Sequence, residues 1–535
     1  MTPQTIFGMI VLAQNASRRI VMERFLERQQ RRITGVLSGF DRLLFRGTLR
    51  SISYRNGMDI FLSSQHVLYK DFGPFAERLS GRLKAHAEEL ARRPGRPFQY
   101  LPCPSVSKED IARRIIQADG IEAGLICVLS CVEPCKSFTI RREREARRLV
   151  LVPAERKCLH LYFYFIDCQF GLMHVRLQTW LPFTIQVCLN GREWLARQME
   201  RAGIAYAQAD NCFTSIADLP RAQRLFDRLT ERRWPRFLNA LARRVNPWIA
   251  PASGLDLRGY YWSVRQGEYA TDVMFKDAQS LGAVYPRLVG HAIQQFGCQD
   301  ILRFLGRRVV PARFKGQVTS DIQSRPEGVR IKHRVEENSI KMYDKHGRVL
   351  RIETTINNPR RFKVRRATTR KGQRVMGWIP MRKGVADMAR RVEISRAANE
   401  RYLEALSVVG EPQPTRQTLD PLSVRITRRG RPYRGLRPIG PKDAELFRVV
   451  LSGDFAIQGF RNKDLRERMG LGNPQDPLAR RRASGRITRQ LRLLRAHGLI
   501  RKVSGTRYYR VTQKGHHAMT TALRLREIDV EKLAA

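Results

Sequence analysis

Three consecutive stretches of the N-terminal half restrict the fold more than any other pattern in the chain: the first is rich in aromatic residues, and the next two alternate between apolar and polar residues. A period of two is typical of β-strands with one buried and one open face. We therefore predict an antiparallel meander over residues 158–167, 171–178 and 183–189. His174 falls on the polar face of this meander. Asn190 is expected to cap a following helix that covers the apolar face.

The 535-residue chain is too long for one hydrophobic core, because single cores rarely grow beyond about 250–300 residues. We predict an α+β multidomain protein whose segments differ in sequence pattern. These segments are an N-terminal α+β domain with a polar-faced antiparallel sheet (22–215), a helical region (216–325), a basic β-hairpin and helix region (326–410), a Pro/Arg-rich linker (411–440) and a winged helix-turn-helix (441–535). Residues 1–21 are interpreted as an extension upstream of a true start at Met22.

The formal net charge is +50, from 99 Lys and Arg against 49 Asp and Glu. A globular protein this basic repels itself unless a polyanion neutralises it, and DNA or RNA is the usual polyanion. No segment offers the roughly 18 uninterrupted apolar residues that span a bilayer, so we expect no membrane partner. DNA is the expected partner, with RNA binding and assembly into homo-oligomers as alternatives.

Cysteine usage does not fit a disulfide framework, since the nine cysteines are an odd number at irregular spacing. Cys127, Cys131 and Cys135 recur every four residues, but we interpret them as buried strand residues rather than zinc ligands. The apolar segment 6–13 has no basic residue before it, unlike a secretory signal. These features predict a cytoplasmic protein.

The C-terminal segment has the element order of a winged helix-turn-helix. Three helices and two strands are predicted at 442–451, 462–469, 485–497, 499–503 and 506–512, followed by a final helix. Over about 85 residues this order resembles winged-helix regulators of the MarR type. The resemblance implies that the third helix enters the major groove of DNA.

The third helix is predicted to divide its residues between the core and DNA, with Ser484 as its N-cap. Ile487, Leu491 and Leu494 share an apolar stripe, whereas Leu493 is expected on the outer side. The residues expected to contact DNA are Arg486, Arg489, Gln490 and Arg492 on the helix and Arg501, Lys502 and Arg507 in the wing.

Residues 339–356 are predicted to form a β-hairpin with one polar face. Apolar and polar side chains alternate along both strands, and a three-residue loop over 346–348 keeps the two faces consistent. This register places Tyr343 opposite Arg351 and Lys341 opposite Glu353. The polar face then carries a tyrosine, two cations and a carboxylate.

This quartet suits phosphodiester transfer, because a tyrosine can attack phosphorus, a cation can offset the developing charge and a carboxylate can hold a divalent ion. Tyr343-Asp-Lys followed by Arg351-Ile-Glu resembles the tyrosine–lysine and arginine–glutamate strands of Rep_trans-type rolling-circle replication initiators, over about 20 residues. The resemblance implies Tyr343 as the nucleophile, Lys341 and Arg351 as catalytic cations, and Glu353 as a ligand of Mg²⁺ or Mn²⁺. The chain lacks the His-hydrophobic-His triplet of the wider superfamily, and His174 is the substitute ligand that we propose.

The hairpin has a second interpretation as a structural ladder, in which Lys341 pairs with Glu353 and Tyr343 packs beside Arg351. Under either interpretation, the basic residues around it are expected to contact a phosphate backbone. These residues are Arg330, Lys332 and Arg334 before the hairpin and Arg365 and Arg366 after it.

Glu268 and Asp272 lie four residues apart in a region predicted to be helical, which would place both carboxylates on one helix face. We interpret them as capping or salt-bridge residues rather than as a metal pair.

Together these patterns favour a DNA-binding protein of mobile-element or replication-initiator type, and the resemblance adds tyrosine-mediated strand nicking. Most of the chain lies upstream of the winged helix, whereas a simple winged-helix regulator is a single domain of roughly 100–150 residues. A MarR-like transcriptional regulator without catalysis and an RNA-binding protein are the alternatives.

Overall fold

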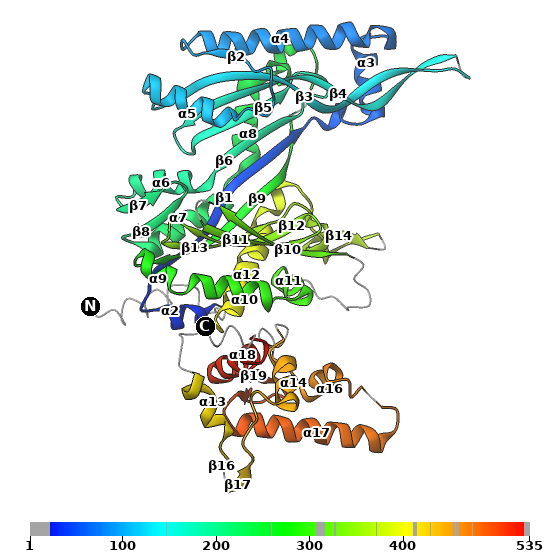
Figure 1. Cartoon of the computed structure of the whole chain (residues 1–535). Coiled ribbons are helices and arrows are strands. Elements are labelled where there is room, and N and C mark those ends of the chain that lie inside the picture. Colours follow the sequence, from blue (N-terminus) through cyan, green and yellow to red (C-terminus); the bar gives the residue numbers. More distant parts are fainter. Residues whose placement is uncertain are drawn as a thin grey trace. The chain divides into compact units, whose positions relative to one another are not determined.

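The computed structural model describes residues 22–528 except for 146, 258, 307–315, 326–327, 371, 410–414, 429, 453–454, 456–458 and 473. The predicted extension (1–21) and the first part of the predicted linker (411–414) therefore lie outside the described residues. The described residues form the α+β structure that the sequence predicts (Figure 1). None of the helices among them is both long and apolar enough to cross a bilayer.

The chain divides into two compact units, each assembled from separated stretches of sequence. Unit 1 comprises Met1–Gly35, Val273–Ile352 and Arg396–Ala535, and unit 2 comprises Val36–Asp272 and Glu353–Ser395. Among the described residues, eleven strands hydrogen-bond in the order β10-β11-β12-β13-β9-β1-β6-β5-β4-β3-β2. Four further strand pairs among the described residues form small separate sheets.

Unit 2 contains the predicted meander, which consists of β4 (Arg148–Asp167), β5 (Gly171–Gln178) and β6 (Ile185–Asn190) as antiparallel neighbours. Asn190 caps α6 (Gly191–Arg201), as predicted. Its side-chain oxygen accepts hydrogen bonds from the backbone N–H groups of Arg192 at 2.8 Å and Glu193 at 3.2 Å.

β3 (Gly124–Glu143) pairs with β4 in a long hairpin whose end extends away from the rest of the sheet in Figure 1. Cys127, Cys131 and Cys135 are buried on β3, which confirms the interpretation of this trio. The other elements of unit 2 are α3 (Arg55–Ser64), α4 (Phe72–Arg92), β2 (Phe98–Tyr100), α5 (Lys108–Asp119), β7 (Tyr206–Ala209), β8 (Cys212–Ile216), α7 (Leu219–Glu231), α8 (Trp234–Val245), β14 (Lys363–Arg370), β15 (Gln373–Pro380) and most of β1 (Ile33–Thr48) and β9 (Tyr261–Phe275).

β9 runs through the region that was expected to be helical. Its aromatic and β-branched residues favour a strand. The period-two pattern is lost because every residue from Tyr269 to Phe275 is buried, as in a strand covered on both faces. The placement of Glu268 and Asp272 on a helix was therefore wrong, although residues four apart on a strand also share one face.

Unit 1 contains β10 (Val318–Arg325), β11 (Gly328–Val335), β12 (Asn338–Lys345) and most of β13 (Val349–Thr355), with helices α2 (Glu23–Gln29), α9 (Ala278–Gly282), α10 (Tyr285–Gln294) and α11 (Cys298–Phe304) and the last part of α12 (Met388–Leu406). One face of β11 and β12 is fully buried and includes Ile331, His333 and Met342. His333 lies between two hydroxyls, with its Nδ1 2.7 Å from the Ser320 oxygen and its Nε2 3.1 Å from the Tyr402 oxygen. Burial lowers the pKa of His333 to about 4.

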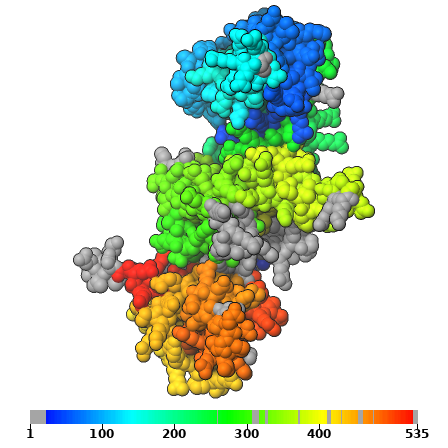
Figure 2. Space-filling view, turned by 90° about the vertical axis from the view of Figure 1, so that its right-hand side faces the viewer, coloured from blue at the N-terminus to red at the C-terminus, as the bar shows by residue number. Residues whose placement is uncertain are grey.

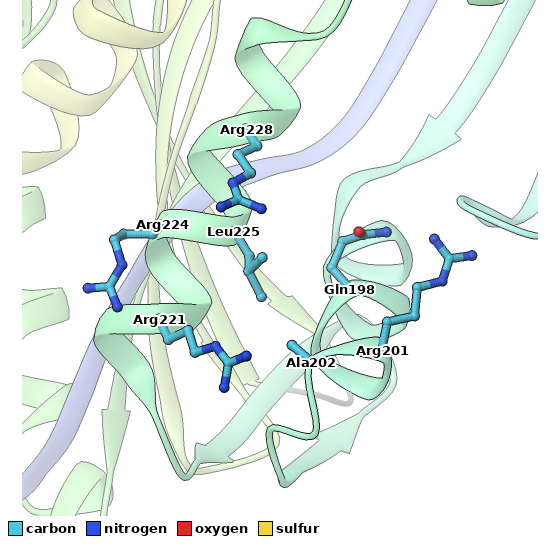
Figure 3. A pocket seen from close by; sticks show the side chains of 7 residues that line it. All are labelled: Gln198, Arg201, Ala202, Arg221, Arg224, Leu225 and Arg228. Carbon is cyan, nitrogen blue, oxygen red and sulfur yellow. The ribbon is translucent and has the colours of Figure 1, made fainter.

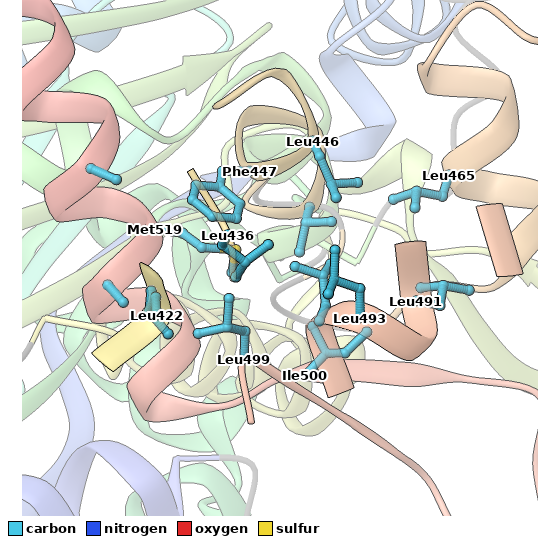
Figure 4. Packing of buried hydrophobic residues seen from close by; sticks show 14 of the residues in the cluster. Leu422, Leu436, Leu446, Phe447, Leu465, Leu491, Leu493, Leu499, Ile500 and Met519 are labelled. Atoms are coloured by element: carbon cyan, nitrogen blue, oxygen red, sulfur yellow. The ribbon is translucent and has the colours of Figure 1, made fainter. Parts of the chain in front are cut away.

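The C-terminal part of unit 1 has the predicted winged-helix order of α14 (Pro441–Val450), α16 (Asn462–Arg468), α17 (Pro477–Ala496), β18 (Ile500–Lys502), β19 (Tyr509–Val511) and α18 (Gln513–Glu527). Figure 4 shows leucines from these elements packed around Phe447 and Met519. The predicted linker also contributes to this core. It contains α13 (Thr415–Ser423), β16 (Ile426–Arg428) and β17 (Arg431–Tyr433), and Leu422 and Leu436 are buried in the same cluster.

The third helix of the winged helix differs from its prediction in two respects. α17 begins after Asp476, whose carboxylate accepts from the backbone N–H groups of Leu478 at 3.1 Å and Ala479 at 2.8 Å, because an Asp-Pro pair is a stronger helix start than Ser484. Ser484 lies inside the helix. Leu493 joins the buried cluster instead of facing outward, which gives α17 a wider apolar stripe than the sequence suggested.

The buried His333 generates a prediction about acid stability. Its pKa is lower in the folded chain than the ordinary 6.5, so the folded state binds fewer protons than the unfolded state between pH 6.5 and about 4. The stabilisation is present above pH 6.5 and is lost as the pH falls toward 4. We expect it to be about 3 kcal/mol at most, measured as the change in free energy of unfolding with pH by denaturant titration.

His333→Gln should reduce this pH dependence by the share of one histidine, whatever its effect on stability at neutral pH, since His160, His174 and His291 also have a pKa lowered to about 4 and remain. His86→Gln is the matched control, since His86 is only partly buried and its Nε2 lies 3.1 Å from the Arg244 carbonyl oxygen. Equal slopes for the His333 variant and the wild type between pH 6.5 and 4 would contradict the assignment.

Candidate metal centre and nucleic-acid interface

Three carboxylates meet in unit 2 from strands that are neighbours in the sheet. Asp41 lies on β1, Glu268 on β9 and Glu353 on β13, and the sheet order places β9 between the other two. One oxygen from each of these carboxylates lies within 4.8 Å of the others. Three carboxylates at this separation can hold a metal ion.

Strand alignment positions this group. The hydroxyl oxygens of Ser38 on β1 and Thr271 on β9 lie 3.0 Å apart. Asp41 is three residues after Ser38, and Glu268 is three residues before Thr271, as in an antiparallel pair. Because three is odd, the two carboxylates lie on the opposite sheet face from the two hydroxyls.

Amide side chains orient two of the carboxylates. Asn211 donates from its Nδ2 to both oxygens of Asp41, at 3.2 and 3.1 Å. Gln266 donates from its Nε2 to the Oε1 of Glu268 at 2.7 Å. Asp41 and Glu353 are buried, with 6% and 2% of their surface exposed, and Glu268 is half-buried. An all-oxygen, anionic donor set of this kind suits a hard divalent cation.

The structure places His174 elsewhere. His174 on β5 pairs with Cys188 on β6, and Cys188 pairs in turn with Leu44 on β1. Leu44 is three residues from Asp41, so His174 lies on the other face of the sheet from the Asp41 carboxylate. Burial, together with the neighbouring Arg42, lowers the pKa of His174 to about 4 and keeps it neutral at neutral pH.

The β12–β13 hairpin has the predicted three-residue turn, in which His346 and Gly347 have positive φ angles of 53° and 67°. Tyr343 and Lys341 on β12 are half-buried. Arg351 on β13 is fully buried, with 0% exposed. The sequence named Glu353 as a metal ligand, and this residue lies in the carboxylate group. It did not single out Asp41, and it interpreted Glu268 as a capping or salt-bridge residue rather than a metal ligand. The available signal for Asp41 was that it is the lone carboxylate in the sequence of β1.

The open face of β11 and β12 in unit 1 is basic. Arg330 pairs with Tyr343, Lys332 with Lys341 and Arg334 with Ser339. Burial and the charges of Lys341, Arg334 and Arg330 lower the pKa of Lys332. Asp321 on β10 lies opposite Lys332 and forms an ion pair with Arg334 at 2.7 Å. Lys332 and Lys341 lie directly opposite one another, and like charges in this position destabilise a strand pair.

A second basic surface is the β14–β15 ribbon of unit 2, which stands out from the surface in Figures 1 and 2. Arg365 is exposed and pairs across the ribbon with Trp378, which is 58% exposed. Arg366 pairs with Gly377 and forms an ion pair with Asp387 at 3.0 Å. An exposed aromatic ring beside an exposed arginine is typical of nucleic-acid-binding surfaces.

The winged helix presents its arginines to solvent. Arg486, Arg489 and Arg492 are exposed along α17, and Gln490 is half-buried. Exposed cations in the wing region are Arg501, Lys502 and Arg507. The longer α17 adds Arg480, Arg481 and Arg482, also exposed, which sequence reasoning missed because it began the helix at 485. A continuous basic helix of this length fits the DNA major groove.

Comparison with known proteins returns no match: no protein-family model, no curated protein and no solved structure matches this chain.

The carboxylate group generates a prediction about metal binding. Mn²⁺ should raise the melting temperature of the full chain, because an ion that binds only the folded state stabilises it. Glu353→Gln should abolish most of this increase by removing one anionic ligand. The measurement is the difference in melting temperature with and without Mn²⁺ for each variant.

Glu133→Gln is the control, because it removes a half-buried carboxylate outside the group, one that bonds to Arg176 at 2.5 Å and to Tyr162 at 2.7 Å. It should keep the wild-type response to Mn²⁺. A wild-type chain whose melting temperature does not respond to either Mn²⁺ or Mg²⁺ would rule out the metal centre.

Proposed function

We propose that this protein binds DNA through its C-terminal winged helix and acts on phosphodiester bonds with the help of a divalent cation. The observation that carries the proposal is the convergence of Asp41, Glu268 and Glu353 within 4.8 Å in a chain with a net charge of +50. Buried carboxylates are costly in isolation, and in a polyanion-binding protein their gathering at one point suits metal-assisted chemistry on phosphate.

Asp41, Glu268 and Glu353 would hold Mg²⁺ or Mn²⁺, and the bound ion would supply charge neutralisation at the phosphate. Tyr343 is the proposed nucleophile. Its hydroxyl loses a proton to solvent, its oxygen forms a bond to phosphorus, and the bond from phosphorus to the 3′ oxygen of the neighbouring sugar breaks. The 3′ oxygen takes up a proton, and the phosphodiester energy is conserved in a phosphotyrosine.

The cations have different roles in this proposal. Lys341 lies in a basic row with Lys332 and is half-buried, so it is suited to contact a phosphate. Arg351 has no exposed surface and acts instead as a positioning residue within β13. The β11–β12 face of unit 1 and the β14–β15 ribbon of unit 2 would each supply sequence-independent contacts to phosphates.

We infer a mobile-element or replication-initiator type of protein for this reason. Such proteins need one module that recognises duplex DNA and another that cleaves a strand. A transcriptional regulator without catalysis would use the winged helix alone, and the experiments below separate the two functions.

Duplex recognition generates the next prediction. Arg489→Ala combined with Arg492→Ala should weaken duplex binding by a few kcal/mol, at about 1–3 kcal/mol per good base contact. Both side chains are exposed, so folding should be preserved. The measurement is fluorescence anisotropy with a labelled duplex selected by the wild-type protein at fixed salt.

Arg448→Ala combined with Arg526→Ala is the control of equal charge, on α14 and α18 of the same winged helix. This control should lose much less affinity. If both double variants lose the same affinity, α17 contributes only charge and does not read the groove.

Strand cleavage generates a separate prediction. Incubation of the full chain with end-labelled single-stranded DNA and Mn²⁺ should give a covalent protein–DNA adduct on a denaturing gel. Tyr343→Phe should abolish the adduct and preserve binding, because only the hydroxyl attacks. Glu353→Gln should reduce the adduct, and excess Mn²⁺ should restore part of it.

Tyr100→Phe is the control, because Tyr100 is an exposed tyrosine at the end of β2. Cleaved DNA without an adduct would indicate that the phosphodiester is hydrolysed by water rather than attacked by a tyrosine. Binding without adduct or cleavage, under any metal, would leave a non-catalytic DNA-binding protein.

A further inference from the structure

Unit 2 contains an arginine-lined groove that plays no part in the site described above. It lies between α6 and α7 and has a volume of about 510 Å³ (Figure 3). Its lining residues are Gln198, Arg201, Ala202, Arg221, Arg224, Leu225 and Arg228. Four of the seven are arginines, and none of these lining residues carries a carboxylate.

The sequence of α7 builds one wall of this groove. Ala222, Phe226 and Leu229 are buried and fix the inner face of the helix. Arg221, Leu225 and Arg228 lie on another side of α7 and extend toward α6 in Figure 3. All three arginines of α7 in the groove are exposed.

α6 builds the other wall. Arg201 lies at its C-terminal end, where its Nη2 donates to the backbone oxygen of Cys168 at 2.8 Å. Gln198 adds an amide, and Ala202 contributes a small apolar side chain. The lining therefore combines four arginines, one amide and the apolar side chains of Ala202 and Leu225. In Figure 3, Arg221 and Arg228 extend toward the space between the helices, whereas Arg224 extends away from α6.

This arrangement is electrostatically unfavourable for the empty protein. Arg221 and Arg224 are three residues apart and Arg224 and Arg228 are four apart, and like charges at these spacings destabilise a helix by a few tenths of a kcal/mol per pair. The N-cap carboxylate of Asp218 accepts from the backbone N–H of Arg221 at 3.0 Å and offsets part of the charge at the start of α7. A bound anion would relieve the remaining repulsion between the arginines.

The chemistry of the groove selects phosphate groups, because guanidinium matches phosphate with two parallel hydrogen bonds. A groove of this volume falls within the usual range for ligand sites, about 300–1,000 Å³. The lining contains no aromatic ring to stack on a base, and a site for a free nucleotide would need one. We infer that the α6–α7 groove binds the phosphate backbone of a nucleic-acid strand without reading its bases.

The test replaces Arg221, Arg224 and Arg228 with Gln in the full chain. Affinity for a fluorescein-labelled 30-nucleotide oligo(dT) is measured by anisotropy over a series of salt concentrations. The slope of log affinity against log salt should fall in magnitude by up to about 2, at about 0.7 per phosphate of single-stranded DNA. Affinity at 150 mM salt should fall at least tenfold.

The matched control replaces Arg92, Arg93 and Arg113 with Gln, removing three charges that already pair with carboxylates. Arg92 and Arg93 lie 2.7 and 2.9 Å from Glu89, and Arg113 lies 2.7 Å from Glu109. This variant should retain the wild-type slope within the error of the measurement. An equal loss in both variants would mean that the groove contributes only general charge, which overturns the inference.

Two further outcomes would also overturn it. If the groove variant retains the wild-type slope and affinity, no phosphate is bound in the groove. The second outcome is measured by calorimetry with inorganic triphosphate. If triphosphate binds the wild type but not the groove variant, and DNA binding is the same in both, the groove binds a free polyphosphate instead. The inference rests on the proposed function only in naming nucleic acid as the ligand. A wild-type chain that binds no DNA at any salt would contradict the proposed function itself.

Discussion

The buried ion pair between Arg192 and Asp272 connects the parts of unit 2 on which both surfaces depend. The two side chains have 0% and 1% of their surface exposed and approach to 3.2 Å. Arg192 also donates to the backbone oxygen of Ala270 at 3.3 Å, and its guanidinium lies 5.1 Å from the Phe226 ring of α7. One side chain thus joins α6 and α7, which form the arginine groove, to β9, which carries Glu268. Removing either charge would leave the other buried without compensation, at a cost of about 3–5 kcal/mol.

Local patterns were sufficient to predict much of the fold. The alternation in the meander, the cap at Asn190 and the turn of the β12–β13 hairpin depend on neighbouring residues, and the structure contains all three. β9 was missed because its second half is buried on both faces and shows no alternation. The start of α17 was misplaced because two helix-start signals, Asp476 and Ser484, competed in one stretch.

The candidate site could be predicted only in part from the sequence. Glu353 stood in a hairpin whose register follows from local alternation. Asp41 and Glu268 join it through strand pairings between distant parts of the chain, and the spacing of residues along the sequence gives no information about such pairings. His174 was a reasonable substitute by chemistry, yet the pairing of β5, β6 and β1 places it on the other sheet face. To decide which face of the sheet a residue occupies across several strands, one must know how many residues separate the paired positions in each strand.

The face that a residue occupies depends on whether the number of residues to a paired position is odd or even. This limits how the sequence can vary over evolution. Loops within the long segments that separate β1, β9 and β13 can lengthen or shorten without moving the three carboxylates, because the strands themselves set their positions. The three-residue interval from Ser38 to Asp41 has no such freedom, since adding or deleting one residue there would turn the Asp41 carboxylate to the opposite face. Relatives that share this chemistry would therefore preserve short intervals within strands while diverging widely in overall length and loop sequence.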